Sequence, residues 1–167
     1  AFLTKDVDCP QFLINVVGGG VYKEKLQELA RDLKIEPRVK FLGELDNDQI
    51  KKVFMETDIF VNLSYSEGFP TSVLEAGAAG LPVIATDVGG TREIIISNNH
   101  GLLVKPRAVA ELCLALKALV SNRHLGVTMG KKLQKHIDQN FLWSKIVDQY
   151  LELFERINKN FMQNLIP

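Results

Sequence analysis

Short apolar runs alternate with amphipathic stretches along about the first two thirds of the chain. A continuous apolar run bounded by glycine or proline is typical of a buried strand, whereas apolar residues three or four positions apart indicate a helix packed on one face. The apolar runs predict strands at residues 12–17, 39–42, 59–63, 82–86 and 101–104. The helical spacing predicts intervening helices at residues 22–33, 46–55, 71–79 and 92–96.

The alternation stops after the fifth predicted strand, and three further helices are predicted, at residues 108–120, 124–139 and 144–159. Strands that are apolar throughout, each followed by a helix, indicate βαβ units and a parallel sheet. The sequence therefore predicts an α/β fold of three layers, in which a Rossmann-like parallel sheet carries helices on both faces.

The last predicted helix has an apolar face and a tryptophan at its start. We expect Trp143 to pack this helix onto the domain. Where the rest of the face stays uncovered, self-association of the chain is expected. That face consists of Ile146, Val147, Tyr150, Leu151, Phe154 and Ile157.

Composition narrows the class of protein. The chain has 167 residues, enough for a single domain with its own core. Its net charge is zero, which argues against a nucleic-acid binder. No apolar run approaches the ~18 residues of a membrane-spanning helix, and the first residues do not resemble a signal peptide. Cys9 and Cys113 are far apart and form no CxxC pair, so we expect a reducing, cytoplasmic setting and no metal site.

Candidate chemistry lies in three loops that follow predicted strands, at residues 18–20, 64–70 and 87–90. Ligands of such sheets bind outside the carboxyl ends of the strands. The second loop carries Glu67 and opens a helix whose free N–H groups could hold a phosphate. Glu75 lies one turn into that helix. We expect the helix to be buried, so that the Glu75 carboxylate needs a partner such as vicinal sugar hydroxyls.

Other interpretations of these residues stay open from the sequence alone. Ser72 and Glu75 have the spacing of a capping box, in which Glu75 would fold back on the helix start. Glu67 could be an ordinary exposed loop acid. Asn62-Leu63-Ser64 has the form of a glycosylation acceptor, but the end of a buried strand is a poor place for one. His124 and His136 lie in polar helical sequence, and we expect both to be solvated.

The segment from Glu67 to Ala76 resembles the E-x7-E signature of retaining glycosyltransferase family 4, the group 1 enzymes with the GT-B fold. Glu67 and Glu75 stand at the required spacing, with Gly68-Phe69-Pro70 between them. Other segments match the family in the same order, at residues 16–20, 39–43, 58–61, 80–85, 88–93 and 101–104. The resemblance covers nearly the whole chain and implies the C-terminal, donor-binding half of a GT-B enzyme.

The resemblance implies a role for each glutamate. Glu75 would bind the ribose hydroxyls, and Glu67, the catalytic residue, would lie against the donor sugar. The donor would be a UDP-, GDP- or ADP-sugar, transferred with retention and without a metal or other cofactor. The implied donor-binding residues are Gly18, Gly19, Phe41, Leu42, Gly43, Glu67, Gly68, Phe69, Pro70, Thr71, Leu74 and Glu75.

The chain also departs from the family pattern. The arginine and lysine that the family carries near the first strand have no counterpart here, so we expect residues 1–167 to be a single donor-binding domain without its first strand and without the N-terminal acceptor domain. Such a fragment should be inactive alone and bind nucleotide weakly. The whole enzyme would serve polysaccharide or glycolipid synthesis in the cytoplasm, touching the inner face of the membrane only through the missing half.

Two other functions compete with this one. A stand-alone nucleotide-binding or regulatory module with a flavodoxin-like sheet would need a phosphate-binding first turn, but Gly18-Gly19-Gly20 lacks the full G-x-G-x-x-G pattern. A GT-B epimerase or phosphorylase would keep the fold and change the reaction. A phosphorylase would need a lysine for pyridoxal phosphate, and residues 64–90 contain none.

Overall fold

The computed structural model of the chain describes residue 3 and residues 9–163, with side chains described as far as residue 159. The predicted strands and helices all form, most of them within about two residues of their expected ends. A short 3₁₀ helix, which was not predicted, begins at the Glu36-Pro37 pair, where proline suits the first turn. The strands are β1 (Ile14–Val17), β2 (Val39–Gly43), β3 (Phe60–Asn62), β4 (Val83–Thr86) and β5 (Leu102–Val104).

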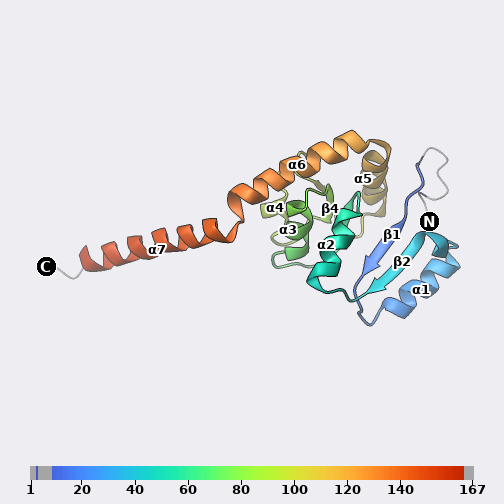
Figure 1. Cartoon of the computed structure of the whole chain (residues 1–167), viewed down its shortest axis with the longest axis horizontal. Coiled ribbons are helices and arrows are strands. Elements are labelled where there is room, and N and C mark those ends of the chain that lie inside the picture. The colour runs from blue at the N-terminus through green and yellow to red at the C-terminus, as the bar shows by residue number, and fades with distance from the viewer. Residues whose placement is uncertain (1–2, 4–8, 164–167) are drawn as a thin grey trace.

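The helices return the chain from the end of one strand to the start of the next (Figure 1). The carboxyl ends of the strands therefore lie toward one edge of the molecule. The helices are α1 (Lys23–Asp32), η2 (Glu36–Arg38), α2 (Asn47–Met55), α3 (Thr71–Ala78), α4 (Thr91–Ile94), α5 (Val109–Ser121), α6 (Arg123–Asn140) and α7 (Trp143–Gln163).

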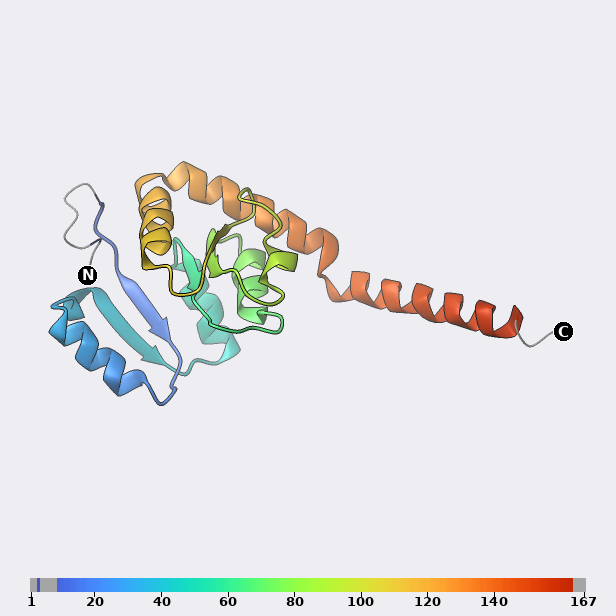
Figure 2. The ribbon, with the colours of Figure 1, turned by 180° about the vertical axis from the view of Figure 1, so that it is seen from behind.

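The strands form two parallel sheets instead of one. β1 pairs with β2, and β3, β4 and β5 form the second sheet in that order. β1 lies between β2 and the three-stranded sheet (Figures 1 and 2). The two sheets correspond to strands 3-2 and 4-5-6 of the doubly wound order 3-2-1-4-5-6. The split falls where strand 1 of that order would lie, so β1 and β3 each have one edge without a partner strand in the described residues.

The core lies on the two faces of β4, which is buried along its whole length. Alternate residues of a strand point to opposite faces of the sheet. Val83 and Ala85 pack with Val73 of α3 and Leu133 of α6, among others. Ile84 packs in a second cluster with residues that include Ala115 and Leu119 of α5. The helices therefore cover both faces of this sheet, as predicted.

The prediction that β1 is a buried strand is wrong. Leu13, Ile14 and Val17 leave 64%, 40% and 46% of their surface exposed. The apolar run does form a strand, but no strand pairs with its inner edge in the described chain. Burial depends on what packs against a strand, which the apolar run itself does not determine.

The start of α2 and the end of α3 are fixed by local hydrogen bonds. The Asp46 carboxylate accepts from Gln49 N, and the Gln49 side chain accepts from Asp46 N, both at 2.9 Å, as in a capping box. At the end of α3, Gly80 has a φ of +78° and donates to Gly77 O, while Leu81 donates to Ala76 O. This Schellman motif ends α3 and delivers the chain into β4.

α7 extends away from the rest of the molecule (Figures 1 and 2). Its apolar face is exposed, as the sequence analysis allowed: Tyr150, Phe154 and Ile157 show 57%, 61% and 54% of their surface. The expectation that Trp143 packs the helix onto the domain is wrong, because Trp143 is 83% exposed. α7 leaves the body at its first residue, so this ring has no apolar surface to cover.

Two glycines of α6 give a matched test of the packing of α6 on the chain between α3 and β4. A Cβ at Gly130 would lie 2.0 Å from the backbone oxygen of Gly80, whereas at Gly126 its nearest neighbour would be Pro82 Cγ at 3.4 Å. We expect Gly130→Ala to lower the free energy of unfolding by about 1–3 kcal/mol, as overpacking does. Gly126→Ala should be neutral or stabilising by up to about 1 kcal/mol, because alanine favours helix. Urea unfolding followed by circular dichroism measures both, and equal effects would contradict this packing.

Candidate functional site

The Glu67 carboxylate is held by an amide group at the end of β3 and a hydroxyl group just after it. Ser64 Oγ lies 2.5 Å from Glu67 Oε1, and Asn62 Nδ2 lies 3.5 Å from the same oxygen. The backbone oxygen of Ser64 accepts a 2.6 Å bond from the hydroxyl of Thr86, at the end of β4. Glu67 is half-buried. It is therefore a positioned carboxylate, and not the plain exposed loop acid of the alternative interpretation.

A glycine turn after β4 packs directly on the backbone of the Glu67 loop. Gly90 N donates to Gly68 O at 2.8 Å. Gly89 has a φ of +49°, and a Cβ there would lie 1.7 Å from the backbone carbonyl oxygen of Glu67. Only glycine satisfies both the conformation and the close approach. The second and third predicted ligand loops are thus one packed unit.

Aromatic rings connect the same loop with the end of α6. The Phe69 and Phe141 ring centroids are 5.8 Å apart, Phe141 and His136 are 5.6 Å apart, and His136 and His100 are 5.1 Å apart. The expectation that His136 is solvated is wrong, because its Nε2 atom is buried and has no hydrogen-bond partner in the part of the chain that the structure describes. The contact between Phe69 and Phe141 places the junction of α6 and α7 beside the Glu67 loop.

Glu75 lies on the exposed side of α3. The expected burial of its carboxylate is wrong, because α3 turns Val73, Ala76 and Gly77 toward the core instead. The capping-box interpretation is also wrong. Pro70 occupies the cap position, and no side chain caps this helix. The carboxylate of Glu75 is consequently open to a ligand from solvent.

The neighbouring predicted residues differ in exposure. Pro70 is buried, Leu74 is half-buried, and Gly68, Phe69 and Thr71 are exposed. Thr71 is the first residue of α3, where N–H groups lack partners within the helix. Exposed N–H groups at this helix start are suited to bind an anion.

The first glycine loop meets the end of β2. Gly18 N donates to Gly43 O at 2.7 Å, and both glycines have positive φ, +129° and +74°. A Cβ on Gly19 would lie 2.8 Å from the Glu44 side chain. The structure thereby brings together two segments, residues 18–19 and 41–43, that were predicted to face one ligand.

A lysine that the sequence analysis did not single out lies beside these glycines. Lys23 Nζ would be 3.9 Å from a Cβ placed on Gly43. The side chain is half-buried in the first turn of α1, where the helix dipole disfavours a cation. A basic residue three positions after a glycine loop, in the first turn of the predicted helix, is the signal that could have found it.

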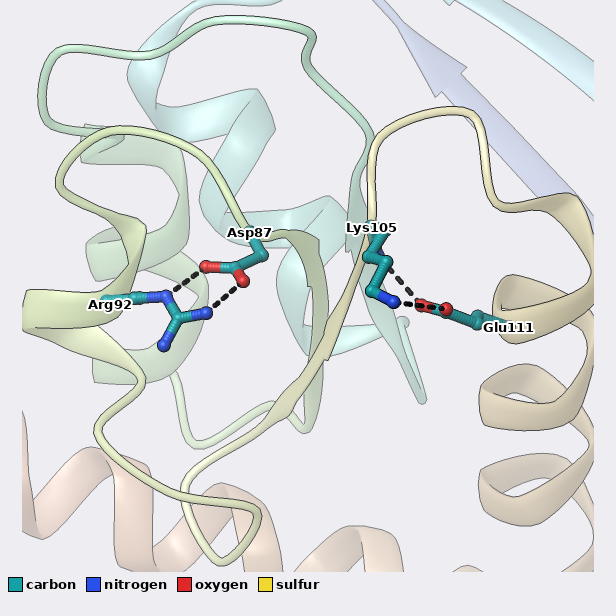
Figure 3. A network of polar contacts seen from close by, with 4 residues as sticks. All are labelled: Asp87, Arg92, Lys105 and Glu111. Atoms are coloured by element: carbon teal, nitrogen blue, oxygen red, sulfur yellow. Dashed lines mark hydrogen bonds and ion pairs between the residues drawn. The ribbon is translucent and has the colours of Figure 1, made fainter.

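Charged side chains line the ends of β4 and β5 (Figure 3). Asp87 accepts two bonds from the Arg92 guanidinium, and this hydrogen bond and charge raise the pKa of Arg92. Glu111 accepts a 2.9 Å bond from Lys105 N and lies 3.9 Å from Lys105 Nζ. These pairs fix the two loops, because each joins the residue after a strand to the helix that follows.

The protein-family comparison matches residues 3–141 of this chain to the model described as glycosyl transferases group 1. The chain belongs to the group 1 glycosyl transferases. This confirms the family that Glu67, Glu75 and the ordered short segments indicated.

Relatives of this glycosyl transferase chain include the D-inositol 3-phosphate glycosyltransferase of Rhodococcus opacus. The two sequences are 34% identical over 145 residues, which is 86% of this chain and 32% of that protein. The chain therefore spans about a third of the length of this curated relative.

Solved structures of glycosyltransferases have the same fold. Sucrose-phosphate synthase from Thermosynechococcus elongatus matches with a TM-score of 0.82 and 26% identity, over 95% of this chain and 42% of that one. HepE from Anabaena in complex with UDP matches with a TM-score of 0.83 and 25% identity, over 92% of this chain and 44% of that one. These neighbours are GT-B enzymes, and they confirm the predicted fold.

Within the described residues, no helix combines the length and apolar character needed to span a membrane.

The rings of Phe141, His136 and His100, which pack behind the Glu67 loop, predict that stability depends on pH. Burial first, and then the nearby His136 and Lys132, lower the pKa of His100. Protonation of His100 therefore costs more in the folded chain than in the unfolded one, where the pKa is about 6.5. The contribution of neutral His100 to the free energy of unfolding is complete above pH 6.5. It is lost as the pH falls from that value toward the lower pKa of the folded chain.

We expect His100→Asn to reduce the loss of stability between pH 7.5 and pH 5.5, measured by urea unfolding at both values. His124→Asn, at an exposed histidine of the same chain, is the control and should leave the loss unchanged. An unchanged loss in His100→Asn would show that this histidine does not carry the dependence.

Proposed function

We propose that the chain is the donor-binding domain of a retaining glycosyltransferase, which transfers a sugar from a nucleoside diphosphate sugar to an acceptor. The observation that carries this proposal is the arrangement of the two glutamates. Glu67 is held by Ser64 at the carboxyl end of β3, and Glu75 is exposed one turn into α3, where its carboxylate has no partner among the described residues. One ligand can reach both, because the start of α3 lies between them.

The two carboxylates suit different parts of a nucleotide sugar. Glu75 is free to accept hydrogen bonds from both ribose hydroxyls, a common use of an acidic residue in dinucleotide-binding folds. Glu67 is the catalytic residue of the proposal and would lie against the donor sugar. The exposed N–H groups at Gly68 and Thr71 would hold the diphosphate, whose charge the helix dipole favours.

The remaining predicted contacts fit the other end of the donor. Phe41, Leu42 and Gly43 end β2 and would face the nucleobase. Gly18 and Gly19 would line the cleft beside them, since Gly18 bonds to Gly43. Pro70, Phe69 and Leu74 would shape the loop between the sugar and the diphosphate. No metal is required in this proposal, because backbone dipoles can stabilise the leaving diphosphate.

The class of donor is supported by a structural neighbour. HepE from Anabaena was solved with UDP and with UDP-glucose. UDP-, GDP- and ADP-sugars are all compatible with the contacts proposed here, because the nucleobase would meet mainly Phe41, Leu42 and backbone. The choice between them is an outcome of the binding experiment below.

The rest of the enzyme would complete the site. This chain covers less than half of the solved structures it resembles. We propose that the whole enzyme also contains the first strand of this donor-binding domain, with its basic diphosphate contacts, and an N-terminal acceptor domain that covers the apolar face of α7. The whole enzyme would work in the cytoplasm, at the inner face of the membrane, in polysaccharide or glycolipid synthesis.

Titration with UDP, GDP and ADP by calorimetry tests the role of Glu75. We expect one of the three nucleotides to bind, and Glu75→Gln to weaken its affinity at least about tenfold, because the amide has no charge and only one of the two acceptor oxygens of the carboxylate.

The matched control for this titration is Glu56→Gln. Glu56 ends α2 and lies toward the amino end of β3, the opposite edge of the sheet. The affinity of Glu56→Gln for the nucleotide should equal that of the wild type. Equal affinities in Glu75→Gln and the wild type would remove Glu75 from the nucleotide site.

The second prediction concerns transfer itself. The isolated chain should release no nucleoside diphosphate from a nucleotide sugar in the presence of an acceptor, because the acceptor would be bound by the other domain. A coupled assay for the released diphosphate measures this. Measurable turnover by residues 1–167 alone would refute the two-domain proposal.

A further inference from the structure

Asn62, the last residue of β3, is the centre of a polar cluster beneath the Glu67 loop. Its Oδ1 atom accepts from Ser64 N at 3.2 Å and lies 2.8 Å from Ser64 Oγ. Its Nδ2 atom donates to Ser72 Oγ at 3.2 Å and approaches Glu67 Oε1 at 3.5 Å. One side chain therefore links the end of a strand, the loop and the start of α3.

The orientation of the Asn62 amide is fixed by its backbone partner. An N–H group can only donate, so the atom that faces Ser64 N must be the amide oxygen. The amide NH₂ group is then directed at Ser72 and Glu67. Exchange of the two amide atoms would place two donors against each other, which the cluster excludes.

Ser64 has one hydroxyl proton and two acceptors within reach. The proton can go to Glu67 Oε1 at 2.5 Å or to Asn62 Oδ1 at 2.8 Å. When Glu67 is ionised, the bond to the carboxylate is the stronger, because it is charge-assisted. Asn62 Oδ1 remains satisfied by Ser64 N. The hydroxyl of Ser64 is therefore committed to Glu67.

Ser64 itself is held in place from the neighbouring strand. Thr86, the last residue of β4, is buried and donates its hydroxyl proton to Ser64 O at 2.6 Å. Glu67 Oε1 is thus fixed through a chain of bonds that ends in the core. The other carboxylate oxygen, Oε2, has no protein hydrogen bond in the described residues.

We propose that Ser64 and Asn62 are positioning residues for Glu67. They hold one carboxylate oxygen and leave the other turned to the ligand. The identity of that ligand, the sugar of the donor, rests on the proposed function. Fixing the carboxylate before the donor arrives removes the cost of ordering it during binding.

The proposal also gives Asn62 and Ser64, which have the spacing of a glycosylation acceptor, a role that involves no glycan. The asparagine side chain is half-buried and committed to Ser64, Ser72 and Glu67. Ser66, two residues further along, is exposed and makes no such bond in the described chain. Ser64→Ala and Ser66→Ala therefore remove the same hydroxyl from the same loop, but only the first should act on Glu67.

The first experiment needs no ligand. We would record the ¹³C resonance of the Glu67 carboxyl carbon at pH 7 in the wild-type chain, Ser64→Ala and Ser66→Ala, with the carboxyl carbon of Glu75 as an internal reference. Ser64→Ala should move the Glu67 resonance and leave that of Glu75 in place, and Ser66→Ala should move neither. An unmoved Glu67 resonance in Ser64→Ala overturns the proposal.

A second pair of variants separates the hydroxyl group from effects on folding. Ser64→Thr keeps the hydroxyl, and Ser64→Val replaces it by a methyl group of similar size. Ser64→Thr should retain the wild-type Glu67 resonance and Ser64→Val should not. Equal spectra for these two variants would also overturn the proposal.

The second experiment compares a nucleoside diphosphate with its nucleotide sugar by calorimetry. Ser64→Ala should leave the affinity for the diphosphate unchanged. It should reduce about tenfold the gain in affinity that the sugar provides, because a charge-assisted hydrogen bond is worth about that factor. A moved Glu67 resonance with no change in that gain would leave the positioning role intact and contradict the sugar-binding role of Glu67. Loss of diphosphate affinity in Ser64→Ala would instead contradict a role confined to Glu67.

Discussion

Burial of β4 on both faces is the constraint on which the rest of the structure depends. Val83 and Ala85 pack on one side and Ile84 on the other, so the strand cannot shift without exposing a cluster. Its carboxyl end delivers three parts of the site. Thr86 holds Ser64, Asp87 holds Arg92, and the Gly89–Gly90 turn packs on the Glu67 loop. The position of Glu67 is thus set by the core.

The two surfaces that the structure leaves uncovered have one explanation in the proposed function. In the described residues, β1 has exposed apolar side chains and an edge without a partner strand, and α7 has an exposed apolar face and extends from the body. Monomeric proteins rarely leave apolar patches of this kind in contact with water. In the proposed enzyme, one further strand and the acceptor domain would cover both. The ring contact from Phe141 to Phe69 lies between α7 and the Glu67 loop, so the same pair of rings would stabilise both the proposed domain contact and the proposed donor site.

The sequence was sufficient for the order of the elements, because apolar runs and helical spacing record local structure directly. It was also sufficient for the family, since Glu67 and Glu75 have a distinctive spacing. It could not give the burial of β1, because that depends on a neighbouring strand and not on Ile14 or Val17 themselves. It could not decide the face of α3 on which Glu75 lies.

The residues that hold Glu67 in place were harder to identify from the sequence than Glu67 itself. Asn62 and Ser64 showed only the pattern of a glycosylation acceptor, and Thr86 showed no pattern, because its partner is 22 residues away in sequence. His136 looked solvated from its polar neighbours and is instead packed against Phe141. Contacts between loops depend on sheet pairing, which short-range spacing does not record.

The most direct test of a donor site at the carboxyl ends of the strands is a map of backbone amide shifts on addition of UDP-glucose at millimolar concentration. We expect the largest changes to cluster at Gly18–Gly19, Gly43 and residues 67–71, at the carboxyl ends of the strands of both sheets. Changes confined to the amino ends of the strands or to α7, or no changes when GDP- and ADP-sugars are tried as well, would contradict a donor site in this place.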